Sequence, residues 1–147
     1  MLNEATIWKT IKILAVIGIL LASYLFYNYL AYNVFSLTPL GVCNINSTIN
    51  CDAVTKGVLS TFLGIPVSLV GLIGYFVILF SALTKRKKLA LAMTAFGLVF
   101  CLRLTFLELF VIKVICLVCL ACQIIMLTVF LLSLYLNYFS KAKSPTV

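Results

Sequence analysis

The sequence predicts an all-α integral membrane protein, a bundle of four transmembrane helices that forms a single domain over residues 1–147. Hydrophobic residues make up 65% of the chain and charged residues only 10%, whereas about 25% charged residues is usual in soluble domains. Several apolar runs approach the ~20 residues that one helix needs to cross a bilayer. The net charge of +8 comes from cations at the ends of these runs. It therefore indicates a membrane orientation rather than a nucleic-acid partner.

The first run, residues 13–32, follows Lys9 and Lys12, a pattern that also fits a secretory signal peptide. The run is too long and too rich in tyrosine for a typical signal core. We therefore expect an uncleaved transmembrane helix whose tyrosines form an interfacial aromatic belt at its far end.

Residues 33–65 form the long polar segment of the sequence and are expected to lie outside the membrane as a loop. The sequence Pro39-Leu40-Gly41 breaks helical structure near its start. Two cysteines, Cys43 and Cys51, follow it. The stretch from Asp52 to Phe62 is predicted to form a short helix lying on the membrane surface.

The other three runs are residues 66–83, 89–112 and 114–139. Pro66 suits the first turn of a helix, which does not need its N–H group. Arg103 and Glu108 interrupt the third run, and their spacing places them about 140° apart around a helix, so we do not expect them to pair. The fourth run has 26 uncharged residues, enough to cross the bilayer with some tilt.

The cations outside these runs predict the orientation. With four helices, both termini lie on the same side as the basic loop at residues 85–88. That side carries eight cations, against only Lys56 and Lys113 on the other. By the positive-inside rule, the termini and the basic loop are expected to be cytoplasmic. The 33–65 loop and the head of the fourth helix are then extracytoplasmic or lumenal.

Thiol redox is the chemistry that this composition permits. The chain has no histidine, three acidic residues and six cysteines. Histidine-based triads, mixed Cys/His zinc sites, carboxylate-pair catalysis and calcium or magnesium cages are therefore disfavoured, and no metal site is expected. Four of the six cysteines belong to the predicted outer surface, in a compartment that permits disulfides.

Cys116 and Cys119 form a Cys-x-x-Cys pair at the head of the fourth run, in what we expect to be the first helical turn. Residues three apart lie on one helix face, so the two sulfurs can meet. The helix N-terminus and Lys113 both favour the reactive thiolate. The alternative is that both cysteines are small packing residues. The second cysteine pair, predicted at the same surface, favours a redox role.

The pattern resembles the vitamin K epoxide reductase (VKOR) family over nearly the whole chain. The shared features are four helices, a spaced cysteine pair in the loop after the first helix, and a Cys-x-x-Cys at the lumenal start of the fourth. Cys51-Asp-Ala-Val ahead of residues 62–75 is similar to microbial members in particular. In the unrelated DsbB-type quinone oxidoreductases the Cys-x-x-Cys precedes the spaced pair.

The resemblance implies a monomeric thiol-disulfide oxidoreductase that supports disulfide formation. It would oxidise a separate thioredoxin-like (DsbA-like) partner, because no thioredoxin domain is fused, and reduce a quinone of the menaquinone, ubiquinone or vitamin K type. Cys43 would meet the partner, Cys51 would pass electrons to Cys116, and Cys119 would pass them to the quinone. This exchange needs no histidine.

The predicted quinone contacts are Gln123 and Val67, whose positions the resemblance marks, together with Tyr75 and Arg103. Gln123 lies one turn below Cys119 and can hydrogen-bond a quinone oxygen. Tyr75 has bundle packing as its alternative. Arg103 either supports a negative charge at the redox site or extends its side chain to the outer surface.

Three departures from the family pattern bear on the substrate. Vertebrate members have asparagine at the position of Val67 and tyrosine at that of Gln123, and a serine common after the second loop cysteine is Gly57 here. These differences count against vitamin K epoxide as the substrate and leave quinone reduction intact. The alternatives are a vitamin K epoxide or quinone reductase proper, and a non-enzymatic four-helix scaffold with structural disulfides. Cys101 and Cys122 are expected to be packing or spectator residues.

Overall fold

The computed structural model describes residues 3–37, 45–51 and 61–139, and four α-helices lie within these ranges. They are α1 (Glu4–Asn33), α3 (Val67–Leu83), α4 (Lys87–Leu107) and α5 (Leu117–Tyr138). Three of these, α1, α4 with the turn that extends it, and α5, are long and apolar enough to cross a membrane, and α3 is a shorter apolar helix. The predicted all-α, four-helix fold is confirmed.

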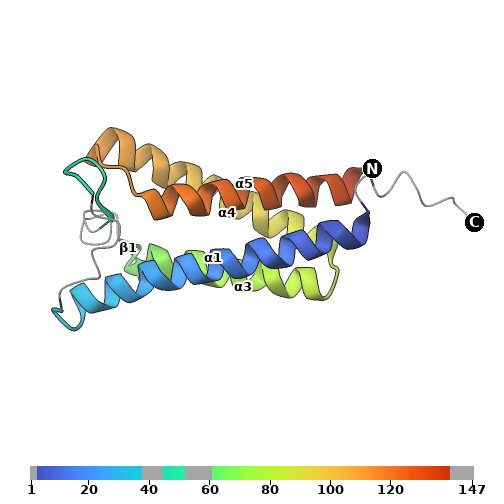
Figure 1. Ribbon diagram of the computed structural model, residues 1–147, viewed down its shortest axis with the longest axis horizontal. Helices are drawn as coiled ribbons and strands as arrows, with labels where there is room; N and C mark the ends of the chain where they lie inside the picture. The colour runs from blue at the N-terminus through green and yellow to red at the C-terminus, as the bar shows by residue number, and fades with distance from the viewer. Residues whose placement is uncertain (1–2, 38–44, 52–60, 140–147) are drawn as a thin grey trace, which may run out of the picture.

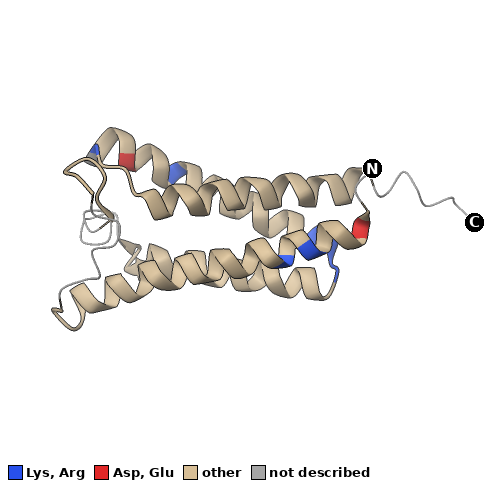
Figure 2. Ribbon diagram, in the orientation of Figure 1, with Lys and Arg blue, Asp and Glu red and all other residues tan. Residues whose placement is uncertain are grey.

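The four helices run side by side along the long axis of the molecule (Figure 1), and each packs against two neighbours. Helix α1 packs mainly on α3 and α5, and α4 packs on the same two helices from the opposite side. The start of α1, the α3–α4 turn and the end of α5 lie at one end of the bundle, and the described loop residues lie at the other (Figure 1). Charged residues are concentrated toward the two ends (Figure 2), as expected for an apolar middle that faces lipid.

Small residues let the helices approach closely. Ala15 and Ala22 of α1 are buried in the core, and Gly18 lies between them in sequence on the same helix. A Cβ atom added at Gly18 would come within 2.3 Å of Cε1 of Tyr75 on α3. The absence of a side chain at this position therefore creates the space that the tyrosine ring fills.

Polar contacts join the elements at the end where the chain begins. Lys87, the first residue of α4, forms an ion pair with Glu4 of α1, with an Nζ–Oε1 distance of 2.9 Å. The Asn137 side-chain amide of α5 donates to the carbonyl of Lys87 at 2.8 Å. Three helices are thus joined at one residue, which fixes this end of the bundle.

A short hairpin precedes α3 at the other end. Strands β1 (Thr61–Phe62) and β2 (Ile65–Pro66) pair antiparallel across a two-residue turn. Leu63 and Gly64 have φ values of 53° and 83°, the positive angles of a type I′ turn. The surface helix predicted over 52–62 is thus wrong at its end, because residues 61–62 are extended and paired. Residues 52–60 lie outside the described residues.

The connection from α4 to α5 departs from the predicted helix boundaries. Helix α4 runs directly into a π-helical turn, η2 (Glu108–Ile112), and Lys113 then adopts a left-handed conformation with φ 54°. Helix α5 begins only at Leu117. The fourth helix therefore does not start at residue 114 as the apolar run suggested, because residues 114–116 lie outside any helix and Ile115 pairs with the loop instead.

Candidate functional site

Cys116 is the residue that caps α5. Its backbone is extended, with φ −91° and ψ 111°, and its Sγ accepts a hydrogen bond from the N–H of Cys119 at 3.2 Å. The prediction that both cysteines lie in the first turn is therefore corrected: Cys116 precedes the helix and Cys119 lies inside it. The N–H group of Cys119 has no partner within the first turn of the helix, and it binds the Cys116 sulfur instead. The positive end of the helix dipole lies beside the same sulfur.

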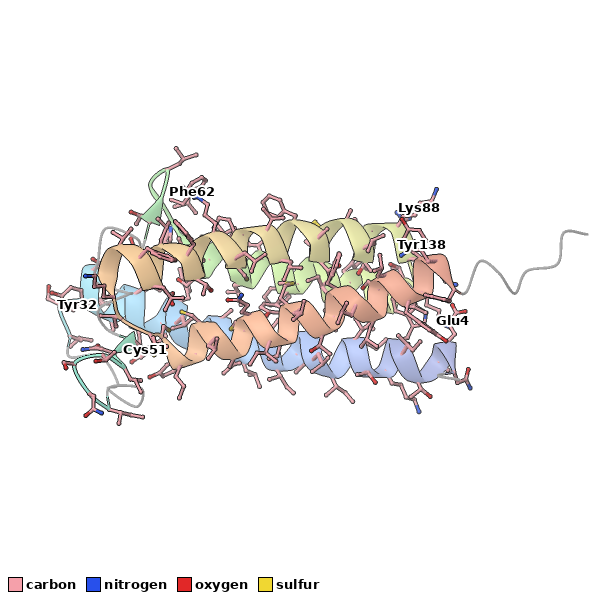
Figure 3. All side chains as sticks on the ribbon, turned by 90° about the horizontal axis from the view of Figure 1, so that it is seen from above. Glu4, Tyr32, Cys51, Phe62, Lys88 and Tyr138 are labelled. Carbon is pink, nitrogen blue, oxygen red and sulfur yellow. The ribbon has the colours of Figure 1, made fainter. Side chains whose placement is uncertain are left out.

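Cys51 and Cys116 bring the two predicted cysteine pairs into contact. Their sulfur atoms are 3.4 Å apart, and Cys51 is 2% exposed while Cys116 is fully buried. Cys51 is in a disulfide bond, whereas Cys116 and Cys119 are free thiols. Cys43 lies outside the described residues. Figure 3 shows Cys51 next to the start of α5, at the opposite end of the molecule from Glu4.

Backbone hydrogen bonds hold the Cys51 loop over the head of α5. Ile49 and Ile115 form a parallel bridge. The N–H of Ile115 donates to the carbonyl of Thr48 at 2.8 Å, and the N–H of Asn50 donates to the carbonyl of Ile115 at 3.3 Å. Asn50 and Ile115 directly precede Cys51 and Cys116, so these backbone bonds hold the two cysteines together. The contact between the sulfurs therefore does not depend on side-chain packing alone.

The sulfur pair lies in a small apolar cluster of its own. Leu25 of α1 is buried with Cys51 and Cys116, and Tyr24, Val118 and Cys119 pack against this cluster. Apolar side chains exclude water from the two sulfurs. Exclusion of water limits competing reactions of a thiol with dissolved species.

A cavity of about 130 Å³ lies between the four helices, directly below the cysteines. Cys119 lines the cavity, whereas Cys116 packs against Cys51 of the loop. The Cys-x-x-Cys pair therefore connects the loop cysteine to the cavity. Three of the predicted quinone contacts, Val67, Tyr75 and Gln123, also line the cavity.

The remaining predicted contact, Arg103, is not among the lining residues. It is exposed, and its guanidinium carbon lies 4.6 Å from the ring centroid of Phe62 in the hairpin. The Phe62 ring also meets Phe100 edge-on, at 5.9 Å between centroids. Arg103 thus fastens the hairpin to α4 by a cation–π contact.

Two hydrogen bonds fix polar side chains around the cavity. The Thr105 hydroxyl donates to Oε1 of Gln123, so the Gln123 amide presents its NH₂ group as a donor. The Tyr75 hydroxyl donates to the carbonyl of Cys122 at 2.8 Å. The hydroxyl of Tyr75 therefore joins α3 to α5, and its ring forms a wall of the cavity.

Sequence reasoning missed several cavity residues. Glu108 and Thr105 line the cavity, and so do Cys101 and Cys122, which were expected to be packing or spectator residues. Glu108 carried a usable signal, because an acidic residue within an apolar run marks a functional site by default. Within residues 3–37, 45–51 and 61–139, no group of three or more histidine, cysteine or acidic side chains could hold a metal ion.

The chain matches one known protein family. The model of the vitamin K epoxide reductase family aligns with residues 9–134, a range that includes all six cysteines and nearly all of the four helices. No curated protein matches the chain. Members of this family are membrane proteins with disulfide and quinone redox function. Because the match covers well over half of the sequence, the chain belongs to the vitamin K epoxide reductase family of membrane oxidoreductases.

Proposed function

We propose that this protein oxidises a separate thioredoxin-like protein and passes the electrons through two cysteine pairs to a quinone. The observation that supports this proposal most directly is the 3.4 Å contact between the sulfurs of Cys51 and Cys116, above a cavity lined by Cys119. A scaffold with purely structural disulfides has no need to keep a buried free thiol against a disulfide.

The first half of the relay is thiol-disulfide exchange. The partner reduces the Cys43–Cys51 disulfide, and the Cys51 thiolate attacks the Cys116 sulfur of the oxidised inner pair. A Cys51–Cys116 disulfide forms and Cys119 leaves as a thiolate. Cys43 then attacks Cys51, which restores the outer disulfide and releases Cys116. The presence of a disulfide at Cys51 beside free thiols at Cys116 and Cys119 supports an exchange between the two pairs.

The cavity suits the ring of a quinone. A dry apolar cavity of about 150 Å³ accepts benzene, and this one is of similar size and mostly apolar. Gln123 offers an amide N–H donor for a carbonyl oxygen, and Val67 and the Tyr75 ring supply apolar walls. When bound, a quinone supplies the acceptor for two electrons and two protons. The residues of the cavity would orient it against Cys119 and keep water away.

Partner trapping and quinone reduction together test this proposal. Purified protein is incubated without oxygen with a reduced thioredoxin-like protein and menadione or a short-chain ubiquinone. We expect stoichiometric oxidation of the partner and formation of quinol. In a separate incubation with the oxidised partner, Cys43 of the Cys51→Ala variant attacks the partner disulfide. The covalent adduct should accumulate on non-reducing gels, because Cys51 is absent and cannot displace the partner.

Two controls separate the alternatives. Vitamin K epoxide offered in place of the quinone tests for an epoxide reductase. If Cys43→Ala and Cys119→Ala both retain full partner-dependent quinone reduction, the relay is refuted and the scaffold becomes the better interpretation. Loss of turnover in both variants, together with the Cys51→Ala adduct, would support the relay.

A further inference from the structure

Glu108 is a buried acid that the relay above leaves without a role. The structure describes two acidic residues, and Glu108 is the buried one, with 6% of its surface exposed. It is the first residue of the π-helical turn η2 and lines the same cavity as Cys119 and Gln123. A carboxyl group buried at membrane depth is costly, so its position calls for a chemical reason.

The surroundings of Glu108 point to the Cys119 thiol. The thiol of Cys119 and the backbone of Cys116 lie within hydrogen-bonding reach of its carboxyl. Among the described residues, no lysine or arginine forms an ion pair with Glu108. Arg103, five residues earlier, is exposed and lies over Phe62, and Lys113 is exposed. The carboxyl group therefore neither belongs to a salt bridge nor reaches solvent.

Three other polar side chains of the cavity are already held in hydrogen bonds. Thr105 and Gln123 bind each other, and the Tyr75 hydroxyl is bound to a backbone carbonyl. The chain has no histidine. The hydroxyls of Tyr29 and Ser68 also line the cavity, but a hydroxyl is a much weaker acid than a carboxyl group. Thiols aside, Glu108 is thus the described cavity-lining side chain that suits general acid–base catalysis best.

We propose that Glu108 is a catalytic residue that takes the proton of the Cys119 thiol and delivers it to the quinone, an inference that rests on the proposed function. Cys119, which leaves the exchange as a thiolate, first takes up one of the two protons that the partner's thiols release, so the step starts with Cys116 as thiolate and Cys119 as thiol. The Cys116–Cys119 bond forms, the S–H bond of Cys119 breaks, and two electrons pass to the quinone. Glu108 carries the Cys119 proton to one quinone oxygen, and water at the membrane surface supplies the second proton. Charge and atoms then balance, with quinol and disulfide as products.

Steady-state kinetics of three variants tests this role. Glu108→Gln keeps the size and hydrogen-bonding capacity of the side chain but cannot take up a proton. We expect its kcat for quinone reduction to fall by ~10²-fold or more, the usual contribution of a general base, with KM for the quinone unchanged. Glu108→Asp should recover part of the loss. Glu4→Gln, which removes a carboxylate at the opposite end of the bundle, should match the wild type.

A second readout needs no turnover. In quinone-free protein, reduction of the Cys116–Cys119 disulfide creates the thiol that faces Glu108. The infrared difference spectrum between the two states should show a carboxyl band that shifts in Glu108→Asp and disappears in Glu108→Gln. The same spectrum for Glu4→Gln should be unchanged. This measurement on the wild type and the aspartate variant decides the matter if Glu108→Gln fails to fold.

The exchange between the two cysteine pairs separates this inference from the function on which it rests. In a Cys119→Ala background, the Cys116 thiolate attacks Cys51 of the Cys43–Cys51 disulfide and releases Cys43, so the Cys51–Cys116 disulfide can be trapped. Glu108→Gln should leave the rate of this exchange unchanged. A wild-type protein that reduces no quinone would refute the proposed function. A wild-type kcat in Glu108→Gln, a loss confined to KM, or a spectrum without a Glu108 band would each overturn the role of Glu108 alone.

Discussion

Single side chains around the cavity divide into those that touch its interior and those that hold them in place. Gln123 points its amide into the cavity and Thr105 fixes which end of that amide faces inward. Arg103 belongs to neither group, since it contacts Phe62 on the outside. Substitutions at these residues therefore have different expected effects.

Replacing Thr105 by valine removes the hydroxyl that orients Gln123 while keeping the shape of the side chain. A neutral hydrogen bond contributes ~1 kcal/mol, so we expect KM for the quinone to rise roughly fivefold, with kcat little changed. The matched control is Thr128→Val, because that exposed hydroxyl bonds only to the carbonyl of Ile124 in its own helix. Equal KM values for the two variants would contradict an orienting role.

Replacing Arg103 by leucine should leave quinone turnover at the wild-type level, because the guanidinium lies outside the cavity. The loss of the contact with Phe62 should lower the free energy of unfolding by about 0.5–1 kcal/mol, the usual value for an exposed cation–π pair. Turnover and thermal unfolding in the same detergent measure both. A large fall in turnover with unchanged stability would return Arg103 to the redox site.

At the scale of elements, the link between α4 and α5 positions the sulfurs. Ile115→Pro removes the N–H group that bonds to Thr48 at 2.8 Å. We expect the Cys51–Cys116 disulfide to form roughly 10-fold more slowly, because a backbone hydrogen bond contributes about 0.5–1.5 kcal/mol and its loss also disturbs the alignment of the two sulfurs. Ile115→Val retains the N–H group and should behave as wild type. The rate is measured in a Cys119→Ala background by quenching and non-reducing gels.

The close approach of α1 and α3 gives a second prediction at this scale. Gly18→Ala places a methyl group 2.3 Å from the Tyr75 ring, so the helices must separate or the ring must move. We expect about 1–3 kcal/mol of destabilisation, as for other overpacked cores. Gly71→Ala, which meets nothing within 4 Å, is the control for stability and should not lower the melting temperature.

For the whole molecule, the charge distribution predicts an orientation. We expect the lysines of residues 85–88 to be protected from an impermeant amine reagent in intact cells, and Lys113, which is exposed in the link between α4 and α5, to be modified. The positive-inside rule is the reason. Mass spectrometry of the labelled protein reads out both sites. Labelling of the 85–88 loop from outside would reverse the proposed topology.

The sequence predicted the four helices because long uncharged runs have one stable form in a bilayer. It did not predict the hairpin or the 113–116 link, because both depend on tertiary pairing. Leu63 adopts a positive φ only because the two strands pair, and Ile115 leaves helical geometry because it bonds to the loop. From the sequence alone, the apolar run around Ile115 predicts a helix, because its hydrogen-bond partners in the loop are distant in the chain.

Part of the cavity could be anticipated and part could not. Gln123 lies one turn from Cys119 on the same helix, so its place follows from helical spacing. The side on which Arg103 and Glu108 fall depends on how α4 is rotated against its neighbours. Their spacing showed that they face differently, and only packing shows that Glu108 faces inward.

The burial of Cys51 and Cys116 also keeps their sulfur atoms away from solutes in the surrounding water. Small soluble thiols and oxidants meet almost none of either sulfur, since the two residues are 2% and 0% exposed. Electrons on the inner pair are therefore shielded from leakage into the surrounding pool, even in a compartment that oxidises exposed thiols. In the proposed relay, the inner pair would stay reduced until a membrane acceptor arrives, and the flux of electrons would follow the supply of that acceptor rather than the redox state of the water outside.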